Sequence, residues 1–171
     1  MELGNIKVRL DKPYPKIVNA TNDQMTVNIL KNLAGSRTSE LTAVLQYIYQ
    51  SVIADKSADE IGAIFEEIGI VEMTHLDLLM HAITDFGGTP KYEDSQGNQF
   101  NSNYINYTVK LKEMLNNNIL AEQRAIEQYN EAIKRVKNES LKELFRRIIQ
   151  DEELHIKVFK YLKDSVEFLS I

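Results

Sequence analysis

Residues 141–169 read LKELFRRIIQDEELHIKVFKYLKDSVEFL, and this stretch decides the fold. Positions spaced alternately by four and three residues lie on one face of a helix. In this stretch they are Leu141, Phe145, Ile148, Glu152, His155, Phe159, Leu162, Val166 and Leu169. All but two are apolar, so this face is predicted to be buried. The exceptions are neighbours on it, Glu152 and His155.

The same interruption occurs elsewhere in the chain. In residues 61–86 the apolar face is broken only by Glu72 and His75, again three residues apart. Glu122 interrupts the apolar face of residues 111–136, and Glu40 lies among Leu33, Val44 and Tyr47. The chain therefore places four glutamates and two histidines where a helical protein buries apolar side chains.

The periodic segments predict an all-α fold. Four helices are expected at residues 22–54, 58–86, 103–137 and 141–169. The first and last pairs are joined by turns of a few residues, so each pair is expected to form an antiparallel hairpin. Gly87–Ser102 is long enough to cross the whole bundle. We expect residues 1–20 to form an extended arm and residues 21–171 to form one four-helix bundle with a long crossover.

Buried carboxylates need compensation. An unpaired one costs several kcal/mol, and four of them together could not all remain ionised. Two divalent cations would neutralise four carboxylates. Glu and His three residues apart on one helix face can bind the same ion. Within each predicted hairpin the polar residues also lie at similar distances from the turn, so we expect a dinuclear metal site at one height of the bundle.

Composition excludes several other classes. The chain has 20 Lys+Arg and 25 Asp+Glu, a net charge of −5, which argues against nucleic acid or an anionic membrane as the main partner. It has no cysteine, which excludes a thiol nucleophile, a disulfide framework and a Cys-ligated metal. No apolar run approaches the ~20 residues of a membrane span. A cytoplasmic location is expected.

These motifs resemble those of bacterioferritin. Residues 40–47 (ELTAVLQY) resemble its first ligand helix, and Glu122 with residues 131–133 (EAI) resembles its third. Residues 72–75 (EMTH) and 151–155 (DEELH) resemble its two Glu-x-x-His motifs. The chain is thus similar to the ferritin-like superfamily, which includes bacterioferritins, rubrerythrins and manganese catalases.

The resemblance implies a ligand set. Glu40 and Glu122 would each bind one metal, Glu72 and Glu152 would bridge the two, and His75 and His155 would each bind one. Asp151 would orient His75 across the bundle. Tyr47 and Tyr129, each seven residues after a glutamate, are placed either beside the metals or in an ordinary aromatic core. Met73 lies where bacterioferritins bind a shared haem. Packing against a neighbour explains it as well, and haem is not expected.

The function expected from this set is a di-iron carboxylate oxidoreductase, which reacts Fe(II) with O₂ or peroxide as a ferroxidase or peroxidase does. Rubrerythrins carry a Cys-rich iron domain that this chain lacks, so an external electron donor would be needed. A homo-dimer or larger oligomer is expected. Three alternatives stay open: a dimanganese catalase, a subunit of an iron-storage cage, and a metal-free structural bundle.

Overall fold

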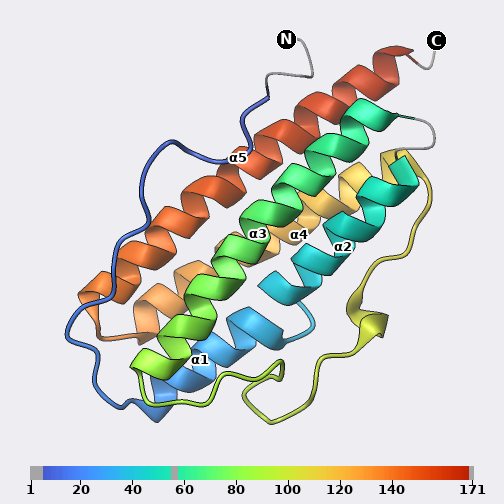
Figure 1. Ribbon diagram of the computed structural model, residues 1–171. Helices are drawn as coiled ribbons and strands as arrows, with labels where there is room; N and C mark the ends of the chain where they lie inside the picture. Colours follow the sequence, from blue (N-terminus) through green and yellow to red (C-terminus); the bar gives the residue numbers. More distant parts are fainter. Residues whose placement is uncertain (1–5, 55–57, 170–171) are drawn as a thin grey trace.

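The bundle consists of α2 (Glu40–Ala54), α3 (Asp59–Asp85), α4 (Leu111–Arg135) and α5 (Glu139–Leu169). The computed structural model describes residues 6–54 and 58–169. A further helix, α1 (Gln24–Gly35), precedes α2 and packs on α3 (Figure 1). The described residues contain no β-strand, only an isolated bridge between Glu93 and Gln99. The predicted all-α architecture is confirmed.

Two hairpins make up the bundle. Helices α2 and α3 pack together, as do α4 and α5, and residues 86–110 cross between the pairs (Figure 1). Helix α3 ends at Asp85, and Phe86 is its C-cap. The next residue, Gly87, has a φ of 83°, a left-handed conformation that glycine adopts without strain. The sequence predicted this stop and the long crossover correctly.

The expected first helix, residues 22–54, is in fact two helices. It is interrupted between Gly35 and Glu40, where Ser36 has an extended backbone. The crossover packs closely against the end of α1, where a Cβ on Gly35 would lie 2.8 Å from the backbone nitrogen of Glu93. Across the break the Thr42 hydroxyl donates to the Ser36 carbonyl at 3.2 Å. Because of the break, Glu40 begins α2 instead of lying in the middle of a helix.

The third helix was also predicted too long. We expected it to begin at residue 103, but α4 begins at Leu111. Residues 102–104 form a short 3₁₀ turn, and the chain then has no regular secondary structure up to Lys110. The Asn106 backbone N–H donates to Gln46 on α2, and the Tyr49 hydroxyl donates to the Tyr107 carbonyl. These contacts replace helical hydrogen bonds in a stretch whose Asn and β-branched residues are poor helix formers.

The apolar core has two parts. Phe145 and Ile148 on α5 belong to one buried cluster, which includes residues of α1. Phe159 and Leu162, further along the same helix, belong to the other. The predicted buried face of α5 is therefore confirmed from Leu141 to Leu162. Glu152 and His155 lie between the two clusters, so apolar layers enclose the polar one.

The chain before α1 contains no helix from residue 6 onward and runs alongside α5 (Figure 1). Val18 anchors it at one end, because its backbone N–H donates to the Ser140 hydroxyl and its carbonyl accepts from Asn138. We call residues 6–20 the arm.

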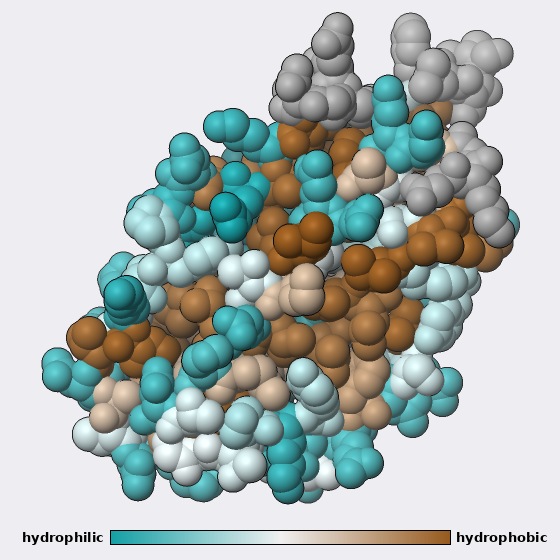
Figure 2. All heavy atoms as spheres, viewed as in Figure 1, coloured by the Kyte–Doolittle hydropathy of each residue, from teal (hydrophilic) through white to brown (hydrophobic). Residues whose placement is uncertain are grey.

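The outer surface of α2 and α3 carries several exposed apolar side chains. Figure 2 shows hydrophobic side chains gathered over these two helices. Its exposed members are Leu45, Ile48 and Val52 on α2, and Ile70 and Met73 on α3. Among the helices of the described residues, none is both long and apolar enough to cross a membrane.

Candidate metal centre

All six predicted ligands meet inside the bundle. Glu40 comes from α2, Glu72 and His75 from α3, Glu122 from α4, and Glu152 and His155 from α5. Every one of them is at most 5 % exposed. They form two overlapping groups, each with ligand atoms within 4.8 Å of one another. One group adds Glu40 and His75 to the shared pair Glu72 and Glu152, and the other adds Glu122 and His155.

The group around His75 has three carboxylates. His75 Nδ1 lies 3.0 Å from Glu72 Oε2, 3.2 Å from Glu152 Oε1 and 3.7 Å from Glu40 Oε2. These oxygens come from three different helices. The Nδ1 atom of His75 therefore faces carboxylates on several sides.

The group around His155 repeats this geometry. His155 Nδ1 lies 2.9 Å from Glu72 Oε1, 3.0 Å from Glu152 Oε2 and 3.7 Å from Glu122 Oε1. Glu72 and Glu152 therefore each turn one oxygen to either histidine. This is the disposition a bridging carboxylate requires, whereas Glu40 and Glu122 each contact a single group.

The opposite nitrogen of each histidine faces away from the acids. His75 Nε2 lies 3.3 Å from Asp151 Oδ2 and 3.2 Å from the Tyr14 hydroxyl. His155 Nε2 lies 2.9 Å from the carbonyl oxygen of Val8. A carbonyl only accepts hydrogen bonds, so His155 Nε2 carries the proton. In neutral His155 the Nδ1 lone pair then faces the cluster, as metal binding requires.

The arm supplies much of this outer support. Asp151 accepts from the Leu10 backbone N–H at 2.9 Å and from the Tyr14 hydroxyl at 2.7 Å. Arg147 lies 2.8 Å from Asp151 and donates to the carbonyls of Leu10 and Lys12. Its guanidinium also lies over the Tyr14 ring. These contacts fix the arm to α5 behind both histidines.

Sequence reasoning placed Asp151 behind His75, and the structure brings them together. It did not identify a hydrogen-bond partner for His155, and it did not assign Val8, Tyr14 and Arg147 to the centre. Arg147 precedes Asp151 by one helical turn on a face predicted to be polar, a spacing that indicates an ion pair. Nothing in the sequence identifies the Val8 carbonyl, because every residue has one.

Tyr47 and Tyr129 both lie in the centre. The Tyr47 hydroxyl donates to Glu122, and the Tyr129 hydroxyl donates to Glu40. Both tyrosines are fully buried, and burial raises the pKa of each well above its ordinary value. They therefore remain neutral hydrogen-bond donors. Met73 lies elsewhere, 51 % exposed on the outer face of α3.

The crowding of buried carboxylates in the centre shifts the pKa values of its residues. Burial, with the charge of Glu72, raises the pKa of Glu40 to about 7. Burial, with the charges of Glu72 and Glu152, raises the pKa of Glu122 to about 8. For His75 and His155, burial lowers the pKa, but the surrounding carboxylates outweigh it and raise the pKa well above normal. Without metal, the folded protein thus reduces the repulsion among these carboxylates by binding protons.

Two buried carboxylate oxygens without a hydrogen-bond partner in the described part of the chain indicate that the cluster suits metal ions. Glu72 Oε1 and Glu152 Oε1 are buried, and neither accepts a well-oriented hydrogen bond from the described residues. Each lies close to a histidine Nδ1, but one N–H cannot satisfy three carboxylates. Such atoms are costly unless a cation coordinates them. The donor set of carboxylates and imidazoles suits iron and manganese.

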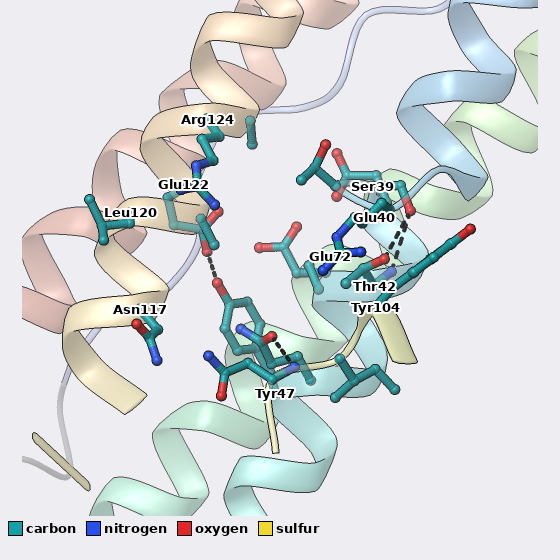
Figure 3. Close-up of a pocket in the computed structure, with 18 of the residues that line it drawn as sticks. Ser39, Glu40, Thr42, Tyr47, Glu72, Tyr104, Asn117, Leu120, Glu122 and Arg124 are labelled. Atoms are coloured by element: carbon teal, nitrogen blue, oxygen red, sulfur yellow. Dashed lines mark hydrogen bonds between the residues drawn. The ribbon is translucent and has the colours of Figure 1, made fainter. Parts of the chain in front are cut away.

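A cavity leads to this cluster. It has a volume of about 510 Å³ and lies between α2, α4 and the crossover. Glu40, Glu72, Glu122 and Tyr47 line it (Figure 3), and so does Tyr129. A small oxidant therefore has a route to the carboxylates.

Known proteins resemble most of this chain. The sequence model of the rubrerythrin family matches residues 31–163. A protein of Clostridium acetobutylicum described as a probable manganese catalase is 24 % identical, over 96 % of this chain and 78 % of its own length.

Two solved structures have a similar fold. A manganese catalase from Anabaena PCC7120 superposes with a TM-score of 0.84 and 25 % identity, over 93 % of this chain and 80 % of the other. The bacterioferritin of Rhodobacter capsulatus gives a TM-score of 0.75 at 23 % identity, over 87 % of this chain and 89 % of the other, which shows a shared fold.

Proposed function

The chain belongs to the rubrerythrin family, and on that premise we propose that it is a dinuclear metal oxidoreductase that acts on peroxide or O₂. The observation that carries this proposal is the pair of overlapping buried ligand groups that share Glu72 and Glu152. A single-metal site would need only one of them. A structural bundle would have no reason to bury four carboxylates against two histidines.

We assign His75 and Glu40 to one metal and His155 and Glu122 to the other, with Glu72 and Glu152 bridging. Four carboxylates balance the charge of two divalent ions, so the buried site becomes neutral. Two redox-active metals bound by these residues would supply electron exchange with a small oxidant.

The residues around the cluster hold it in shape. Tyr47 and Tyr129 donate hydrogen bonds to Glu122 and Glu40, which holds these two carboxylates in the ligand groups to which they belong. The contacts of His75 and His155 through Nε2 hold both rings with Nδ1 directed inward. Protons held by Glu40 and Glu122 in the metal-free protein leave when metal binds.

Two activities are compatible with this centre. Iron with O₂ or peroxide, in a ferroxidase or peroxidase reaction, is our expectation from the sequence. Dimanganese catalase activity is favoured by the relatives, because proteins of that description match over more than nine-tenths of this chain. The ligand set suits both metals.

Metal analysis combined with an oxygen electrode separates the two. The protein is expressed in medium containing both iron and manganese, and metal atoms per chain are counted. About two manganese ions, with rapid O₂ release from peroxide, would establish catalase activity. About two irons, with peroxide consumption that depends on an added electron donor, would establish a peroxidase. No metal uptake, with no rise in melting temperature on adding Fe(II) or Mn(II), would refute the proposal.

We also propose that copies of the chain associate through the apolar surface of α2 and α3. Exposed apolar patches of this kind commonly mark contacts between proteins. Size-exclusion chromatography tests this. A dimer would exclude an iron-storage cage, a species of 12 or 24 subunits would support one, and a monomer would refute association.

A further inference from the structure

The cavity beside the metal centre is much larger than peroxide requires. Its volume is about 510 Å³, whereas one water molecule takes up ~30 Å³ in the liquid. Sites for small organic molecules have volumes of roughly 300–1,000 Å³. The space is therefore of the size that holds an organic ligand.

The cavity is lined by groups of opposite charge. Glu40, Glu72 and Glu122 are buried members of its lining, while Arg37 and Arg124 are exposed members. Apolar side chains line the space as well: Leu33, Ala43, Ile105, Leu120, Ala121 and Ala125. A ligand with one negative group and an apolar body fits this lining, with its charge at the exposed arginines.

Both arginines are available to a ligand. Arg37 lies over the ring of Tyr104, and neither guanidinium takes part in an ion pair within the described residues. By contrast, Arg146 and Arg147 on α5 are each held by an acid. A planar guanidinium offers paired donors that match the two oxygens of a carboxylate.

The part of the wall formed by Gln46 and Asn106 is held in place by hydrogen bonds to and between amide groups. The Asn106 backbone N–H donates to Gln46 at 3.0 Å, Gln46 donates to Asn118 at 3.1 Å, and Asn118 donates to Gln50 at 2.6 Å. These contacts tie the crossover to α2 and α4. The cavity is therefore formed before a ligand arrives, which lowers the entropy cost of binding.

We propose that this cavity binds a small organic carboxylate, with the carboxylate group paired to Arg37 and Arg124 and the carbon skeleton directed toward the cluster. Binding uses residues of the chain alone and does not require metal. That the ligand then stands on the route of peroxide to the metals rests on the proposed function.

Calorimetric titration of the metal-free, full-length protein tests the binding. Benzoate is the probe, and benzamide, which has the same ring without the charge, is its control. We expect benzoate to bind, and benzamide to bind at least about tenfold more weakly. The double variant R37Q/R124Q should lose about tenfold or more in benzoate affinity. R37K/R124K should recover part of it, since it keeps the charge without the planar fork.

Arg9→Gln provides a matched control, because Arg9 is an exposed arginine that does not line the cavity. This variant should bind benzoate as the wild type does, and melting temperatures should show that all variants fold. Equal binding of benzoate and benzamide, wild-type affinity in R37Q/R124Q, or no benzoate binding would each overturn the proposal.

The metal-loaded protein tests the location. Benzoate should raise the apparent KM for peroxide several-fold and leave kcat unchanged. An unchanged KM at saturating benzoate would contradict a position on the peroxide route. Failure to bind metal would instead remove the proposed function and leave the calorimetric result on the metal-free protein intact.

Discussion

The hydroxyl of Tyr47 on α2 donates a hydrogen bond to Glu122 on α4. The reverse contact joins Tyr129 on α4 to Glu40 on α2. Each tyrosine lies seven residues after the glutamate of its own helix. The two contacts therefore cross the bundle in opposite directions. They also hold the two glutamates that each belong to one ligand group only.

Tyr47→Phe should destabilise the metal-free protein by about 1–3 kcal/mol, because Glu122 would lose a buried donor. Thermal unfolding measures the loss. Tyr49→Phe is the matched control on the same helix, since its hydroxyl donates in an exposed contact, and it should change stability little. Equal effects of the two substitutions would show that the Tyr47 bond contributes nothing particular.

Glu72→Gln should reduce metal content from about two ions per chain to one or fewer. The amide keeps the size of the side chain but loses the charge and one oxygen ligand of a shared residue. Elemental analysis after dialysis gives the count. Glu67→Gln, at an exposed position of α3, should retain both ions. Two ions in Glu72→Gln would contradict the bridging assignment.

Tyr14→Phe should weaken metal binding by about tenfold, as is typical when a partner of a ligating histidine is lost. The reason is its position between His75 and Asp151, with hydroxyl contacts to both. Competition with a chelator measures the affinity. Tyr92→Phe, at an exposed position of the crossover, should leave it unchanged. An unaltered affinity in Tyr14→Phe would mean that the arm does not support the centre.

The metal-free protein should lose stability as pH rises through about 7 to 8. Glu40 and Glu122 have pKa values of about 7 and about 8 in the folded protein, above their ordinary 4.5. The folded state therefore binds more protons than the unfolded state. Its extra stability is complete below pH 4.5 and disappears as the pH passes through these values. The raised pKa values of His75 and His155 act in the same direction.

At low pH the opposite effect takes over. Asp151 and Glu72 have lowered pKa values, because contacts with histidine and, for Asp151, with the arm and Arg147 outweigh burial. Their contribution is lost as pH falls. Melting temperatures of the chelated protein should thus pass through a maximum on the acid side of neutrality, and Glu122→Gln should flatten the decline above it. A melting temperature that rises steadily from pH 6 to 9 would show that these carboxylates are not protonated in the fold.

Much of the architecture could be predicted from periodicity. The buried face of α5 and the stop at Gly87 follow from local patterns, because helix faces and turns depend on residues close in sequence. The break between Gly35 and Glu40 and the late start of α4 were not predicted, and at both places the crossover makes contacts. Its backbone approaches Gly35, and Asn106 bonds to Gln46. Such contacts join segments far apart in the chain.

The sequence by itself determined which residues enter the candidate centre. Apolar spacing forces Glu72, His75, Glu152 and His155 to face inward, because turning them to water would expose the rest of each stripe. Only the tertiary structure decided what surrounds them. The Val8 carbonyl behind His155, the crossed tyrosine contacts and the arginine-lined cavity each arise where separate segments meet. Hydrogen bonding and packing between such segments depend on their positions in space, which no local pattern of residues encodes.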